Sequence, residues 1–271
     1  MSRRRGARRN KRNEGLKAAW NIVFVVLAIA SLTFLYFRTV LSHQTLDEVT
    51  LCPAKPRSTT VLLIDLTDPM NLPQRQDFSN QLEQLVDQIP RYGKLVIAKV
   101  DPISDRLLLP VITKCNPGTA SDVSELDGNP KALERQHQEG FILPLRAAFD
   151  QLMEASSADR SPILESIQSI NLTELQSGSD KNYPRRLIVA SDLLQNTADI
   201  SFYRKLPSAD DLIGGQSFSR VRTDLRGVDV ELWMFQRSDS SRTQPRALPE
   251  LWERLVNAQG GRLIRVYTVS G

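Results

Sequence analysis

Histidine and cysteine are scarce in this sequence, which narrows the chemistry that it can carry out. His43 and His137 are the only histidines among its 271 residues. One lies in a connecting segment and the other in a charged helical pattern. Neither is therefore placed to activate a nucleophile, and a Ser–His–Asp hydrolase is not predicted. The two cysteines, Cys52 and Cys115, have no spacing typical of a zinc site.

Motifs for phosphate chemistry are weak. Gly214-Gly215 has neither the lysine nor the preceding strand of a phosphate-binding loop. The segment 65–68, Asp-Leu-Thr-Asp, is similar to the strand end of an aspartyl phosphotransferase, but that chemistry uses Asp-x-Asp and position 67 is threonine. No catalytic or cofactor-binding residues are predicted.

Positive charge is concentrated in the first residues. Residues 1–19 hold eight of the 35 Lys and Arg and one of the 31 Asp and Glu, which leaves 27 basic and 30 acidic residues beyond them. A mildly acidic body gives no basis for a nucleic-acid surface, and no nucleic-acid partner is expected. A nucleic-acid-binding arm within residues 3–12 is the alternative reading of the basic head.

The sequence has one long apolar run, Trp20–Phe37, without a charged residue. Eighteen helical residues span ~27 Å, close to the ~30 Å hydrocarbon core of a bilayer. The run therefore predicts a transmembrane helix over 20–37; a cleaved signal peptide is the alternative. Because basic residues precede the run, residues 1–19 are expected to be a cytoplasmic head. The chain is then a single-pass protein of a bacterial inner membrane with its C-terminal part in the periplasm.

The segment after the apolar run is expected to be a stalk over residues 38–57, with Pro53 and Pro56. In an oxidising compartment an even number of cysteines favours a disulfide, so Cys52 and Cys115 are predicted to pair. Cys52 precedes the first predicted strand, and Cys115 follows a strand that runs the opposite way, so both are expected at the same end of the sheet. Two unrelated buried thiols are the alternative.

Strand and helix patterns alternate over residues 58–271, which are expected to form one domain. The connection between the second and third strands is too short for a crossover helix, so the third is expected to be antiparallel, and Pro110 favours an edge position. We predict a doubly wound α/β three-layer sandwich with a mostly parallel six-stranded sheet in the order 3-2-1-4-5-6. The expected strands are 61–65, 94–100, 106–114, 187–190, 228–235 and 263–269. The expected helices are 73–89, 131–139, 141–154, 163–170 and 248–259.

In this order the first and fourth strands are neighbours, so Asp65-x-Thr67 and Asp192 follow adjacent strands. Ser161 opens the helix before the fourth strand. This arrangement resembles the von Willebrand factor A domain over residues 58–269. That family builds a metal-ion-dependent adhesion site from Asp-x-Ser-x-Ser, a Thr and an Asp on three loops. Pro69 stands at the second hydroxyl position and cannot ligate, so the motif is degenerate.

The resemblance implies a metal site made of Asp65, Thr67, Ser161 and Asp192. Carboxylate and hydroxyl oxygens suit Mg²⁺ or another divalent cation. Capping and turn duties for Asp65 and Thr67 are the alternative interpretation.

The resemblance also implies a function. We expect a membrane-anchored protein-interaction module, not an enzyme, that recognises an unidentified protein partner at the C-terminal face of the sheet. One alternative is a metal-dependent phosphoryl hydrolase that uses Asp65 and Asp192. Another is a structural tether of an envelope or secretion assembly with a vestigial metal site.

Overall fold

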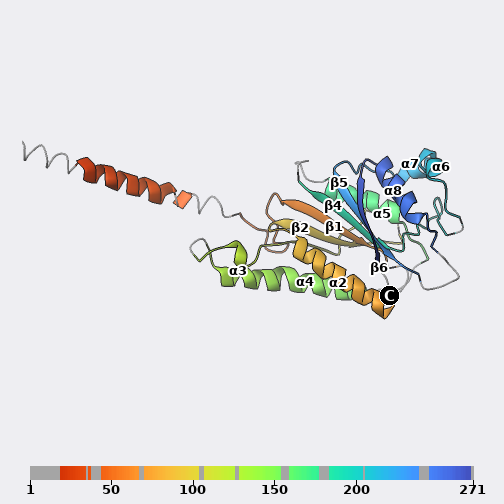
Figure 1. Cartoon of the computed structure of the whole chain (residues 1–271), viewed down its shortest axis with the longest axis horizontal. Helices are drawn as coiled ribbons and strands as arrows, with labels where there is room; N and C mark the ends of the chain where they lie inside the picture. The colour runs from red at the N-terminus through yellow and green to blue at the C-terminus, as the bar shows by residue number, and fades with distance from the viewer. Residues whose placement is uncertain are drawn as a thin grey trace, which may run out of the picture. The chain divides into compact units, whose positions relative to one another are not determined.

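The computed structural model describes residues 19–34, 36–37, 44–66, 70–103, 107–125, 128–153, 159–176, 183–203, 205–237 and 244–269. The chain divides into two units, Met1–Thr45 and Leu46–Gly271. In the first unit residues 19–34 and 36–37 are helical (Figure 1). Within the residues listed above, no helix combines the length and the apolar character needed to cross a membrane.

The second unit is built on a six-stranded sheet in the order β3-β2-β1-β4-β5-β6. Neighbouring strands are parallel except β2 and β3, which are antiparallel. Both the predicted order and the antiparallel edge are confirmed. The strands are β1 (Ser58–Ile64), β2 (Gly93–Lys99), β3 (Ile112–Cys115), β4 (Arg185–Ser191), β5 (Val228–Phe235) and β6 (Arg262–Val269).

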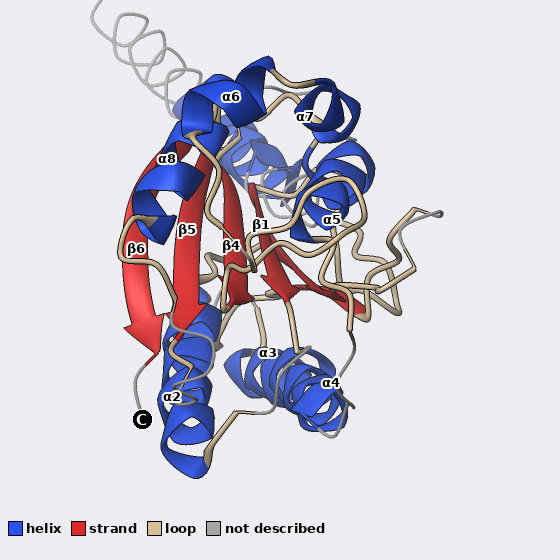
Figure 2. Ribbon diagram, turned by 90° about the vertical axis from the view of Figure 1, so that its right-hand side faces the viewer, coloured by secondary structure: helices blue, strands red, loops and turns tan. Residues whose placement is uncertain are grey.

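Helices cover both faces of this sheet, as the end-on view shows (Figure 2). One face carries α2 (Leu72–Gln88), α3 (Pro130–His137) and α4 (Leu143–Met153). The other carries α5 (Ile163–Ile170), α6 (Ala209–Gly214), α7 (Gln216–Val221) and α8 (Leu248–Ala258). Three short helical turns complete the description: Ala120–Asp122, Gln138–Ile142 and Asn171–Leu175.

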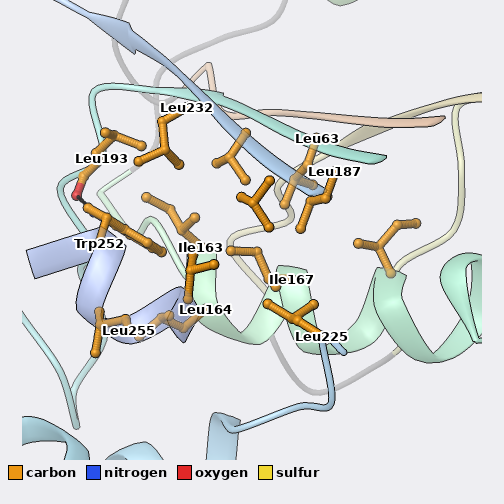
Figure 3. Packing of buried hydrophobic residues seen from close by; sticks show 14 of the residues in the cluster. Leu63, Ile163, Leu164, Ile167, Leu187, Leu193, Leu225, Leu232, Trp252 and Leu255 are labelled. Atoms are coloured by element: carbon orange, nitrogen blue, oxygen red, sulfur yellow. Dashed lines mark hydrogen bonds between the residues drawn. The ribbon is translucent and has the colours of Figure 1, made fainter. Parts of the chain in front are cut away.

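Successive side chains of β1 point to opposite faces of the sheet, so this strand contributes to both hydrophobic cores. Val61 and Leu63 enter the hydrophobic core under α5 and α8, whereas Leu62 and Ile64 enter the core under α2 and α4. All four side chains are fully buried, as expected for a central parallel strand whose two faces are both covered. Figure 3 shows Leu63 and Leu187 packed toward α5, and the Trp252 indole directed at the carbonyl oxygen of Leu193.

Three local predictions are wrong. The third strand was expected over 106–114 but covers only Ile112–Cys115, because Pro110 has no N–H to donate to a ladder. A break was expected at Gly140, yet α3 and α4 join through a π-helical turn, Gln138–Ile142. Ser161 was expected to be the N-cap of α5, but that position is Pro162. Position 140 has room only for glycine as the side chains stand, because a Cβ built on Gly140 would lie 2.7 Å from Cδ1 of Leu51.

A disulfide staples the segment before β1 to the edge of the sheet. Cys52 and Cys115 are bonded, with Cα atoms 4.8 Å apart and a sequence separation of 63. The Cys115 amide donates to the Thr50 carbonyl at 2.8 Å, and Lys114 Nζ donates to the Val49 carbonyl. Residues 49–52 therefore cover part of β3, which shields this edge from pairing with another strand.

Candidate functional site

Asp65 is the first residue after β1, and it is buried at the edge where the parallel strands end. Its amide donates to the Ala190 carbonyl at 2.8 Å, which continues the β1–β4 ladder by one residue. Its side chain accepts two short hydrogen bonds at Oδ2, from Ser161 Oγ at 2.6 Å and from Ser191 Oγ at 3.0 Å. With 4% of its surface exposed, Asp65 is stabilised in the interior by these hydroxyls.

Ser161 reaches Asp65 because its backbone is clamped to the loop after β4. The Ser161 and Asn196 backbones exchange hydrogen bonds of 3.0 and 2.9 Å. The first turn of α5 is satisfied from the same loop, since Gln195 Oε1 accepts from the Leu164 amide at 3.0 Å. The Ser161 hydroxyl is thus directed to Asp65 while Gln195 performs the capping that sequence patterns assign to a serine.

Asp192 is also buried, and its carboxylate is fully engaged. Oδ1 accepts from the Leu194 amide at 2.9 Å, and Oδ2 forms a buried ion pair with Arg237. Ser191 Oγ lies 3.4 Å from Asp192 Oδ1, so one hydroxyl contacts both carboxylates. Burial raises the pKa of Asp192 to about 6, opposed by the Arg237 charge and the Leu194 hydrogen bond and aided by the charge of Asp65. The cost of desolvation therefore outweighs the attraction of the guanidinium.

Arg237 is positioned by groups from two other segments. Its Nη2 donates to the Tyr203 hydroxyl at 2.9 Å, and the guanidinium lies 5.3 Å from the centre of that ring. Gln244 accepts from the Arg237 amide at 3.2 Å and donates to the Asp192 carbonyl at 2.8 Å. The cluster of Asp65, Ser161, Ser191, Asp192 and Arg237, called the switch-point cluster below, therefore ties the segments after β1, β4 and β5 to the start of α5.

The backbone beside this cluster is held in an unfavourable conformation. Leu193 has φ of 63°, in the left-handed region that costs a non-glycine residue about 1–2 kcal/mol. Its amide donates to Ser191 Oγ at 2.8 Å, and its carbonyl accepts from Trp252 Nε1 at 2.9 Å (Figure 3). These two bonds offset the strain and turn the chain sharply at the end of β4.

The structure brings together three of the four predicted metal ligands, Asp65, Ser161 and Asp192. Thr67, like Pro69, lies outside the described residues. Sequence reasoning missed Ser191 and Arg237. The available signal was topological: Arg237 stands two residues after β5, whose neighbour in the sheet is β4, so its charge arrives at the same edge as Asp192.

The described residues do not fit a divalent ion in this arrangement. Both oxygens of Asp192 are engaged, one by a backbone amide and one by a guanidinium that already supplies positive charge. Oδ2 of Asp65 accepts two hydroxyl protons, which directs the donors of Ser161 and Ser191 toward the carboxylate. Within the described ranges, moreover, no group of three His, Cys, Asp or Glu side chains is arranged to hold a metal.

A groove runs beside α5, and one residue of its lining, Glu165, accepts from Gln195 in the loop after β4 at 2.8 Å. It holds about 340 Å³, and its wall is partly apolar. Ile103, Leu107 and Leu172 line it and are 50%, 61% and 53% exposed. Asp101 and Glu165 add two carboxylates to the lining. Large apolar side chains exposed around a groove are typical of surfaces that bind other proteins.

Comparisons with known proteins give likenesses of fold only. The sequence matches no protein-family model and no curated protein. Similar solved structures include the SpRpn10 VWA domain, with 10% identity, coverage of 79% of this chain and 89% of that chain, and a TM-score of 0.43. BatB from Bacteroides thetaiotaomicron, a conserved hypothetical protein, has 10% identity, coverage of 78% and 91%, and a TM-score of 0.39.

An aerotolerance-related membrane protein from Bacteroides fragilis NCTC 9343 has 9% identity, coverage of 79% and 92%, and a TM-score of 0.34. The sheet itself shows the fold. Its order β3-β2-β1-β4-β5-β6, with β3 antiparallel and helices on both faces, fits a von Willebrand factor A-like sandwich.

Proposed function

We propose that the unit Leu46–Gly271 is a protein-interaction module, not an enzyme, that binds its partner where the parallel strands end. The supporting observation is the groove beside α5, where Ile103 and Leu107 are exposed and Glu165 is hydrogen-bonded to Gln195 of the loop after β4. A surface held in place before binding loses little conformational entropy when a partner arrives. Open α/β sheets also bind their ligands at this edge.

The groove favours a partner segment with apolar side chains next to a lysine or arginine. Asp101 and Glu165 supply negative charge to the lining, whereas Arg220, the basic residue there, forms an ion pair with Asp199 at 3.0 Å. Apolar contact with Ile103 and Leu107 supplies affinity, and the carboxylates select for positive charge.

The phosphoryl-hydrolase alternative gains no support from the geometry. A nucleophilic Asp65 needs an oxygen directed at the substrate, yet its Oδ2 is held by Ser161 and Ser191. Asp192 is committed to Arg237.

Site-specific photocrosslinking tests the proposed surface. A photoreactive residue at Leu107 in the full chain should give one discrete crosslinked product in cells. Ile103→Asp should weaken that product about tenfold, because burial of a carboxylate against an apolar partner costs more than about 1.4 kcal/mol.

The matched control is the same photoreactive residue at Pro90, which is exposed just before β2 at the opposite edge. Equal products from both positions would refute recognition at this edge. No product from either position would favour the structural-tether alternative.

The membrane anchor belongs to the same proposal. Its support is the uncharged composition of residues 20–37 and the basic residues before them, which suit a single span with a cytoplasmic N-terminus and a periplasmic second unit. The full chain should stay with bacterial inner membranes through alkaline extraction, and a variant that lacks residues 1–37 should be released. Recovery of both in the wash would argue against an anchor.

A further inference from the structure

We propose that Arg237 is the built-in cation of the switch-point cluster, so that this edge of the sheet is organised without a divalent ion. This inference goes beyond the interaction function and does not depend on it. It concerns which positive charge holds the carboxylates together, and it follows from the disagreement between the ligand set that the sequence predicts and the contacts that the structure shows.

The Arg237 guanidinium occupies the position that a metal ion would need at Asp192. Nε and Nη2 of Arg237 both contact Asp192 Oδ2. The two side chains are 10% and 6% exposed, so the pair is withdrawn from water. A divalent ion must take a carboxylate oxygen at about 2.0–2.6 Å, which the guanidinium nitrogens prevent at this oxygen.

The surroundings of Arg237 show that the contact is built into the fold. Tyr203 offers both its hydroxyl, at 2.9 Å, and its ring face, at 5.3 Å, to the guanidinium. Gln244 joins the Arg237 amide to the Asp192 and Phe235 carbonyls. These contacts come from separate segments, and together they fix the direction of the arginine side chain toward Asp192.

The charge of Arg237 also balances the negative charge of the buried carboxylates. Asp65 and Asp192 are both buried and both contact the hydroxyl of Ser191. Two carboxylates so close to each other and so far from water need positive charge nearby. If the guanidinium is removed, two carboxylates and the hydroxyls of Ser161 and Ser191 remain, which is a set of hard oxygen donors of the kind that Mg²⁺ and Mn²⁺ prefer.

Binding of Mn²⁺ to the full chain, measured by electron paramagnetic resonance, tests this assignment. The wild type should bind no Mn²⁺ at the cluster, and its Tm should not differ between EDTA and millimolar Mn²⁺. Arg237→Ala should bind one Mn²⁺ per chain, and its Tm should rise by about 5 °C when the ion is added. Adding Asp192→Asn to Arg237→Ala should abolish both effects.

Arg237→Lys is the matched control, because it keeps a positive charge and should leave the chain without a Mn²⁺ site. If Arg237→Ala does not fold, Arg237→Gln repeats the test with a longer polar side chain that carries no charge. One Mn²⁺ per wild-type chain that is lost in Asp192→Asn would overturn the proposal. A folded Arg237→Ala or Arg237→Gln variant without Mn²⁺ affinity would overturn it as well.

Discussion

Asp192→Ala should lower the free energy of unfolding by about 3–5 kcal/mol. The change removes the oxygens that accept from the Arg237 guanidinium, 10% exposed, and from the Leu194 amide, and buried donors left without acceptors cost about 1–3 kcal/mol each, more for a charged group. Urea unfolding followed by tryptophan fluorescence measures the loss. The signal is suitable because Trp233 and Trp252 are both buried in the second unit.

The double variant Asp192→Leu/Arg237→Met is the control for this prediction. Removing both charges at once leaves no unpaired ion, so the double variant should lose much less stability than Asp192→Ala alone. Equal losses in the two variants would show that packing at position 192, and not its charge, holds this edge together.

The pH dependence of stability should carry the signature of the same residue. The pKa of Asp192 is raised to about 6 in the folded protein, chiefly by burial, from an ordinary value near 4. The folded state therefore holds this proton more tightly than the unfolded chain does. Its stabilising contribution is complete below about pH 4 and is lost as the pH rises through about 6. Relative to Asp192→Asn, the wild type should lose about 3 kcal/mol over that range. A constant difference between the two would contradict the buried, ionisable Asp192.

Removing the disulfide should lower the free energy of unfolding by about 4 kcal/mol. The bond joins residues 63 positions apart, and a closed loop of that size withdraws about this much conformational entropy from the unfolded chain. Comparing Cys52→Ser/Cys115→Ser with the oxidised wild type by urea unfolding gives the difference.

Wild type in reducing buffer is the control, because it keeps both sulfur atoms and breaks only the bond. It should match the double serine variant. If reduction has no effect while the serine variant is destabilised, the loss comes from packing of the Cys115 side chain, which is fully buried.

The sheet was predictable because its signals are local and redundant. Runs such as Val61–Ile64 and Leu95–Ala98 have no polar face, and only a strand buried on both faces suits them. Their order was predicted from the alternation of strands with helices, which one short hairpin connection interrupts. The start of β3 was mispredicted although Pro110 is a local signal, and the continuous connection at Gly140 was missed because it packs against a distant residue, Leu51. Such contacts leave no periodic trace in the sequence.

The location of the candidate site was predictable from the sequence, but the hydrogen bonds and ion pair that its residues form were not. Asp65, Ser161 and Asp192 were expected to converge because they follow or open elements that end at one edge. The direction of each hydroxyl was not readable: Ser161 carries the pattern of a helix cap, yet it serves Asp65 while Gln195 caps the helix. Arg237 was missed because a charged residue after a strand usually faces water.

The disulfide between Cys52 and Cys115 also determines how a pulling force is transmitted through the chain. If a force pulls the two ends of the protein apart, tension passes directly from Cys52 to Cys115 through the sulfur atoms. The segment between them, residues 53–114, which contains β1, α2, β2 and most of β3, then carries none of it. Extension of about 210 Å is withheld as long as the bond stays oxidised. The force therefore bypasses the strands inside the loop and is applied to the sheet at Cys115, the last residue of β3, while Asp65, inside the loop, is protected.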